Sequence, residues 1–173
     1  DTKWFQLAPL PYLEEARRSP MVADATMLFP LGAPMKAGAQ VLPIQLVVVN
    51  EGFGAMFGVR PLEGDLRTVL TEPGSLALTA STAQRLFGRA NVLGQTVAID
   101  GASFRVGAIL PDPPVNSTIF YEALAGQGTM AWPDDYRKNL MRAWGGIGSR
   151  VYVKLKPGAS AAALEQALPA VGD

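Results

Sequence analysis

At 173 residues, the chain has the length of one ordinary domain and can bury a core without disulfide or metal staples. Its 15 basic and 15 acidic residues cancel, which argues against a nucleic-acid-binding surface. Cysteine and histidine are absent, which excludes disulfides and thiolate nucleophiles and removes the commonest metal ligand and general base. No apolar run approaches the roughly 20 residues that span a bilayer.

The first fifty residues predict a helix followed by two strands. Residues 12–18 follow a proline and carry acidic side chains early and basic side chains late, which suits the helix dipole. Residues 22–29 alternate as a strand does, and residues 31–38, rich in glycine and proline, predict a turn. Residues 40–50 predict a longer strand, whose internal proline is typical of a sheet edge or a bulge.

The next part of the chain predicts short elements in close succession. Residues 51–64 contain four glycines and predict a tight helical turn whose aromatic side chains pack inward. Residues 76–78 predict a small apolar strand. Thr79 or Ser81 can cap the helix that follows, and Gly88 ends it.

A β-hairpin is the clearest local prediction. Residues 96–99 and 103–110 alternate between apolar and polar side chains, and Asp100 and Gly101 stand between them. An Asp-Gly pair in this position favours a type I′ turn, because that turn needs positive φ at both central residues. We therefore expect an antiparallel pair with one buried face.

After the hairpin, residues 111–118 form a proline-rich exit that must leave the sheet. Residues 120–124 are consistent with either a short helix or an inward strand. Residues 151–155 predict a clean alternating strand, and Ser160 is the expected N-cap of a final helix that Pro169 ends.

Residues 132–144 combine aromatic and charged side chains. One interpretation is a solvated, partly helical connection whose tryptophans pack locally. The other is a partner-contact patch, because Trp, Tyr and Arg are the anchors that protein interfaces favour. The contact candidates are Trp132, Tyr136, Arg142 and Trp144.

The order of these pieces resembles the periplasmic core domain of MacB-type (MacB/FtsX-like) ABC-transporter permeases. The resemblance covers residues 47–115 best, with a weaker echo near the C-terminus. The segments that carry it are residues 51–59, 62–64, 75–79, 83–88, 93–96, 104–109 and 151–159.

The resemblance implies an α+β fold with two subdomains. Residues 1–50 and 149–173 would form a discontinuous porter-like α/β part. Residues 51–148 would form an inserted, sabre-like mixed α/β part that contains the antiparallel hairpin. We expect these parts to be joined by hinge-like crossings near residues 50–51 and 145–148, because glycine lies close to both.

The resemblance also implies a function without chemistry in this domain. Relatives hydrolyse ATP at a separate cytoplasmic ATPase subunit or domain, while the extracytoplasmic domain couples membrane-helix motion to substrate export or to a periplasmic partner. Similar permeases serve efflux, lipoprotein release or control of cell-wall enzymes. The implied partners are a second permease copy and a periplasmic adaptor or a peptide or lipid substrate. We expect an excised extracytoplasmic domain of an inner-membrane protein, flanked by transmembrane helices.

Two other classes of function stay open. An extracytoplasmic sensing or ligand-binding module would need a concave apolar pocket with a few convergent polar groups. A hydrolase that uses carboxylates alone would need two acidic residues roughly 5 to 9 Å apart, for which the candidates are Glu63 with Asp65 or Asp134 with Asp135. We expect solvated carboxylates instead, and therefore no catalytic, metal or cofactor site.

Overall fold

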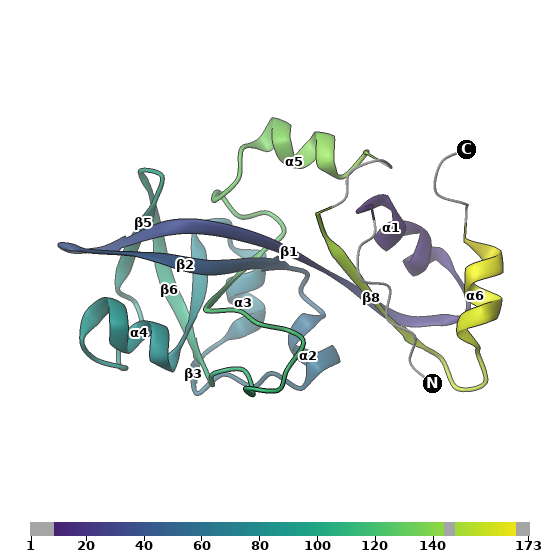
Figure 1. The fold of residues 1–173 in the computed structure, drawn as a ribbon, viewed down its shortest axis with the longest axis horizontal. Coiled ribbons are helices and arrows are strands. Elements are labelled where there is room, and N and C mark those ends of the chain that lie inside the picture. Colours follow the sequence, from purple (N-terminus) through teal and green to yellow (C-terminus); the bar gives the residue numbers. More distant parts are fainter. Residues whose placement is uncertain (1–8, 144–147, 169–173) are drawn as a thin grey trace. The chain divides into compact units, whose positions relative to one another are not determined.

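The computed structural model describes residues 9–143 and 148–168 (Figure 1). Helices and strands alternate along this part of the chain, which confirms the predicted α+β class. The helices are α1 (Pro11–Arg18), α2 (Phe53–Phe57), α3 (Leu66–Thr71), α4 (Ala80–Phe87), α5 (Asp134–Leu140) and α6 (Ala161–Ala167). The strands are β1 (Val22–Ala37), β2 (Gln40–Val49), β3 (Glu63–Gly64), β4 (Ser75–Thr79), β5 (Thr96–Ile99), β6 (Ala102–Leu110), β7 (Ala123–Gly126) and β8 (Arg150–Leu155).

The chain divides into two compact units. The first takes Asp1–Phe29 and Pro133–Asp173, and the second takes Pro30–Trp132. The expected subdomain boundaries are at residues 50/51 and 148/149, whereas β2, which pairs in parallel with β7, belongs to the second unit. The assignment of a porter-like and a sabre-like part stays a prediction.

The second unit is built on a closed ring of six strands. β2 pairs with β7, β7 with β4, β4 with β6, β6 with β5 and β5 with β1, and the pairing of β1 with β2 closes the ring. Closure removes the open edges that an ordinary sheet exposes. The buried side chains of the ring come from every one of its strands and include Met35, Ile44, Leu46, Leu76, Leu78, Val97, Ile99, Phe104, Val106 and Ala123.

Strand β1 is longer than the sequence indicates. Residues 31–38 are not the expected turn: the strand continues to Ala37, and the chain reverses only at Gly38, where φ is +58°. The prediction was wrong because Pro30, Gly32 and Pro34 all fall on the exposed face of a regular alternating strand. Their spacing of two, not their turn-forming character, was the informative signal.

The predicted hairpin is confirmed. Asp100 and Gly101 form the two-residue loop, with φ values of +48° and +83°, and Ile99 lies opposite Ala102. Both central residues therefore have the positive φ that a type I′ turn requires. The helix before the hairpin is also confirmed: Thr79 is the N-cap, and Gly88 ends the helix in a left-handed conformation.

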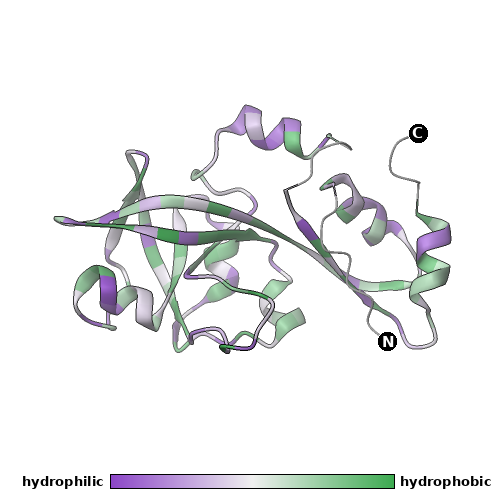
Figure 2. Cartoon of the chain, in the orientation of Figure 1, coloured by the Kyte–Doolittle hydropathy of each residue, from purple (hydrophilic) through white to green (hydrophobic). Residues whose placement is uncertain are grey.

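Helix α3 packs closely on the strands at two glycines. A Cβ built on Gly107 would lie 2.6 Å from both the Ser75 hydroxyl oxygen and the Val69 methyl group. A Cβ on Gly126 would overlap the carbonyl oxygen of Leu70. Both positions therefore require glycine for close approach. Figure 2 shows hydrophobic residues on α3 and along the second half of β2.

The first unit pairs β8 antiparallel with the first half of β1, with Ala25 opposite Val153. Helix α1 buries Leu13 completely. Helix α6 begins at its predicted cap, where the Ser160 hydroxyl accepts a hydrogen bond from the Ala163 N–H at 3.2 Å. Within α6 the buried side chain is Leu164, whereas α5 buries none.

Candidate functional site

Trp132, the first predicted contact residue, is buried. Its side chain is 3% exposed, and its indole N–H donates a hydrogen bond to the Gln127 carbonyl at 3.2 Å. The expectation that it lies on an accessible surface is therefore wrong for Trp132. The sequence could not reveal this, because a tryptophan suits a core and an interface equally well.

The other contact candidates lie on or after α5. Tyr136 is 48% exposed and makes an edge-to-face contact with Phe29, with ring centroids 6.4 Å apart. Arg142 is exposed. Trp144 lies outside the residues that the structure describes, as do residues 145–147 of the expected hinge. The described part of the predicted patch is thus Tyr136 and Arg142.

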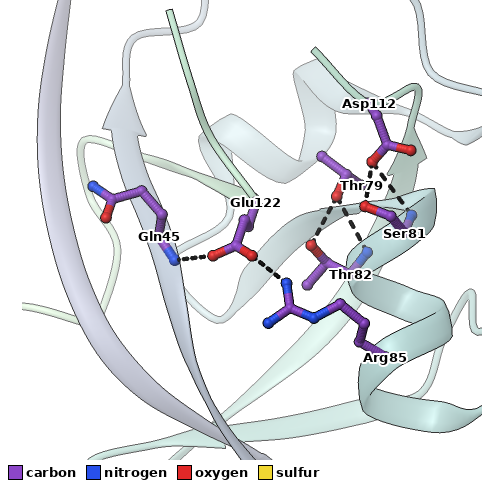
Figure 3. A network of polar contacts seen from close by, with 7 residues as sticks. All are labelled: Gln45, Thr79, Ser81, Thr82, Arg85, Asp112 and Glu122. Carbon is purple, nitrogen blue, oxygen red and sulfur yellow. Dashed lines mark hydrogen bonds and ion pairs between the residues drawn. The ribbon is translucent and has the colours of Figure 1, made fainter. Parts of the chain in front are cut away.

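A polar network fastens the loop between β6 and β7, residues 111–122, to helix α4 (Figure 3). We call this segment the β6–β7 loop. Near its start, Asp112 accepts hydrogen bonds from the Ser81 hydroxyl at 2.5 Å and from the Ser81 N–H at 3.3 Å. A carboxylate is favourable there, because the first turn of a helix carries unpaired N–H groups and partial positive charge.

Glu122 fastens the other end of the loop. Its carboxylate forms an ion pair with Arg85 of α4 and accepts a hydrogen bond from the Gln45 N–H at 2.7 Å (Figure 3). Its backbone N–H donates to the Gln45 carbonyl at 3.0 Å, and its carbonyl accepts from the Thr79 N–H at 3.0 Å. Glu122 thus joins β2, β4 and α4 where β7 is about to begin.

Between these anchors the β6–β7 loop exposes apolar side chains. Val115 is fully exposed and Phe120 is 64% exposed. A turn shapes the loop, in which the Ser117 N–H donates to the Pro114 carbonyl at 2.8 Å. Tyr121, which follows Phe120, is buried, and its ring makes an edge-to-face contact with Phe53, with centroids 6.0 Å apart.

The sequence predicts an exit from the sheet for residues 111–118 and a short helix or an inward strand for residues 120–124, and it does not mark this loop as a site. The available signal was its length, since 12 residues without helix or strand separate β6 from β7. Asp112 and Glu122 at either end of an uncharged stretch were a second signal. Their partners on α4 and β2 are distant in sequence and could not be read from it.

The carboxylates weighed for hydrolysis are all exposed. Asp65 is the N-cap of α3, and hydrogen bonds from the Thr68 hydroxyl and the Arg67 N–H lower its pKa. A general acid needs the opposite shift. Asp134 is paired with Arg137 at 2.7 Å. These interactions give Asp65 and Asp134 structural roles.

In the part of the chain that the structure describes, no three acidic side chains gather as a metal site would require. No helix in residues 9–143 and 148–168 has the length and hydropathy of a membrane span. The ring of strands is filled by buried apolar side chains, so its interior is a packed core.

Comparison with known proteins gives one family and several related folds. The family described as the MacB-like periplasmic core domain matches residues 3–171. No protein in a search of curated sequences matches the chain.

Three solved structures share the fold. A domain of a putative permease protein from Porphyromonas gingivalis aligns with a TM-score of 0.81 and 23% identity, covering 95% of this chain and 76% of that one. The periplasmic region of MacB from Actinobacillus actinomycetemcomitans aligns with a TM-score of 0.67 and 18% identity, covering 94% and 71%. The extracellular domain of the ABC-type transporter YknZ from Gram-positive bacteria aligns with a TM-score of 0.61 and 14% identity, covering 90% and 75%.

Proposed function

The chain belongs to the family of MacB-like periplasmic core domains of ABC-transporter permeases. We therefore propose that it couples the motion of membrane helices to export of a substrate or to a periplasmic partner. In this proposal it performs no chemistry. ATP is hydrolysed elsewhere in the transporter, and this domain passes the resulting movement outward.

The observation that carries the proposal is the way one strand is shared between the two units. β1 contributes its first half to the first unit, where it pairs with β8, and its second half to the ring of the second unit. The return crossing follows Trp132, which is itself hydrogen-bonded and buried. A hydrogen-bonded strand is stiff along its length, so it suits the transmission of a displacement better than a flexible linker does.

Of the two hinges expected from glycine content, residues 145–147 lie outside the described part of the chain and residues 50–51 lie within the second unit. Asn50 is buried there, and its amide donates to the Gln127 side chain at 2.7 Å. We propose instead that displacement passes from one unit to the other through residues 29–30 and 132–133. Proline begins the new unit at both places and restricts the backbone there.

Partner contact forms the second part of the proposal. Tyr136 and Arg142 are exposed residues of the types that interfaces use as anchors, and no side chain of α5 is fully buried, although Tyr136 contacts Phe29. We propose that they contact a periplasmic adaptor, a substrate or a second permease copy. The cytoplasmic ATPase would act through the membrane helices and not through this domain.

The test is an insertion in the full-length permease. A short Gly-Ser insertion between Phe29 and Pro30 should retain ATP hydrolysis and abolish export, because it interrupts β1 between its two paired halves, so each unit still folds while the movement between them is lost. The matched control is the same insertion at the turn after Gly38, which lies inside the second unit and should leave export unchanged. Normal export with both insertions would show that this domain does not transmit movement.

A further inference from the structure

We propose that the β6–β7 loop is a docking surface for a protein partner with an uncharged, apolar pocket, into which Phe120 and Val115 insert. The loop lies in the second unit, away in sequence from the α5 contact residues. This inference rests on the proposed function only in that the partner acts with the permease outside the membrane.

The first step of the argument is that the loop is held rigidly at both ends. Asp112 is bonded to the first turn of α4 by two hydrogen bonds, and Glu122 is bonded to β2, β4 and α4 (Figure 3). Pro113 and Pro114 further restrict the backbone between the anchors. A preorganised loop loses little conformational entropy when it binds, which favours affinity.

The second step is that the exposed side chains of the loop do not serve the fold. Val115 is fully exposed and Phe120 is 64% exposed, whereas the neighbouring Tyr121 is buried. Exposed apolar groups on a rigid loop gain free energy only when another surface covers them.

Charge identifies the chemistry of the partner. Residues 113–120 contain no charged side chain, and the one carboxylate before them, Asp112, is already bonded to Ser81. An anionic or cationic pocket would find no opposite charge on this span. The complementary surface is therefore uncharged, with an apolar centre for Phe120.

A protein fits this loop better than a lipid bilayer does. Asn116 is exposed and stands between the two apolar residues. If Val115 and Phe120 entered lipid together, the amide of Asn116 would be drawn into a medium that offers few hydrogen bonds. A protein pocket can instead offer donors and acceptors at its rim.

The experiment uses the full-length permease in its host, with a photo-crosslinking phenylalanine analogue at position 115. The expected result is a crosslink to a protein, reduced at least about tenfold by Phe120→Ser. Phe120→Ser should also abolish complementation of a permease deletion, while the Tm of the isolated domain stays that of the parent. The matched control is Val41, which is 55% exposed on β2 of the same unit, and neither the analogue there nor Val41→Ser should have these effects.

Crosslinks to lipid alone, or full complementation by Phe120→Ser, would overturn the inference. If Phe120→Ser lowers Tm, Val115→Asp decides, because the fully exposed Val115 can be changed without disturbing packing. Its normal complementation would equally overturn the proposal, and its failure at an unchanged Tm would support it. The proposed coupling function fails separately, when a Gly-Ser insertion between Phe29 and Pro30 leaves export normal.

Discussion

The two units of this domain are packed in different ways. In the second unit, sixteen buried residues form one apolar cluster that draws on all six strands of the ring and on α4. In the first unit, α6 buries Leu164 and α5 buries no side chain, although α1 and β1 contribute Leu13 and Met27 to a small core. A side chain buried in the ring belongs to a core that all six strands share, whereas α5 and α6 bury at most one side chain each. Substitutions at buried positions of the second unit should therefore affect stability more.

The largest expected effect is that of Gly126→Ala in the second unit. The new Cβ would overlap the carbonyl of Leu70. The Cβ is fixed to the backbone of β7 and the carbonyl belongs to the backbone of α3, so α3 must move away from the strands. We expect the free energy of unfolding to fall by about 3 kcal/mol or more. Gly128→Ala is the control, since its Cβ would approach Pro73 no closer than 4.0 Å. Urea denaturation of both variants measures the difference, and equal midpoints would contradict the close packing of α3.

Trp132→Ala tests whether the indole of Trp132 is buried in the second unit. Removing a buried indole and its hydrogen bond to Gln127 should cost about 3–5 kcal/mol. Tyr136→Ala in the first unit should cost less than about 1 kcal/mol, because half of that side chain is already in water. Thermal melts of the two variants compare the units directly. A small loss for Trp132→Ala would return this residue to the list of contact candidates.

The hairpin turn gives a smaller expected effect. Gly101→Val places a β-branched residue at a φ of +83°, which should cost about 1 kcal/mol or more. Gly32→Val is the control in the same unit, because Gly32 lies on the exposed face of β1 and a Cβ built on it would have no neighbouring atom within 4 Å. Denaturation midpoints that are equal for the two variants would show that the turn tolerates the strain.

What the sequence predicted correctly was governed by neighbours in the chain. The cap at Thr79, the stop at Gly88 and the turn at Asp100-Gly101 each follow from the conformational preferences of one or two residues. The final helix cap at Ser160 belongs to the same class. Such local signals do not depend on which distant strand a segment pairs with.

What the sequence missed was governed by pairing between distant segments. The place of β2 in the second unit depends on β2 lying beside β7, and ring closure depends on Met35 lying opposite Ile99. The β6–β7 loop is fastened by the pairing of Glu122 with Arg85, two residues that are distant in the sequence. Trp132 was misplaced because burial is a property of the assembled unit and not of residue type.

Ion pairs sharpen the comparison of the units at a smaller scale. Glu122→Gln removes the charge that Arg85 pairs with, but it keeps an oxygen for the Gln45 N–H. We expect a loss of about 0.5–1 kcal/mol, reduced by salt because Arg85 is partly in water. Glu14→Gln, in an exposed pair with Arg17 on α1, should be close to neutral. Equal losses of unfolding free energy for Glu122→Gln and Glu14→Gln in low salt would mean that the Glu122 carboxylate does not help to fasten the β6–β7 loop.

The smallest expected effect appears at alkaline pH. Burial, reinforced by the negative charge of Asp112, raises the pKa of Tyr121 above its ordinary value of 10.0. The folded state therefore retains this proton at a pH where the unfolded chain releases it. The resulting contribution to stability is present below about pH 10 and is lost as pH rises through the higher pKa of the folded state.

Tyr12 in the first unit provides the matched comparison, because burial alone raises its pKa. Tyr121→Phe should flatten the decline of unfolding free energy between pH 9 and about pH 11 more than Tyr12→Phe does. Part of that difference comes from the charge of Asp112, so Asp112→Asn in the parent should reduce the contribution of Tyr121. Chemical denaturation across this pH range measures all three variants. A decline that Tyr12→Phe flattens as much as Tyr121→Phe would mean that the carboxylate fastening the β6–β7 loop does not act on the tyrosine that follows it.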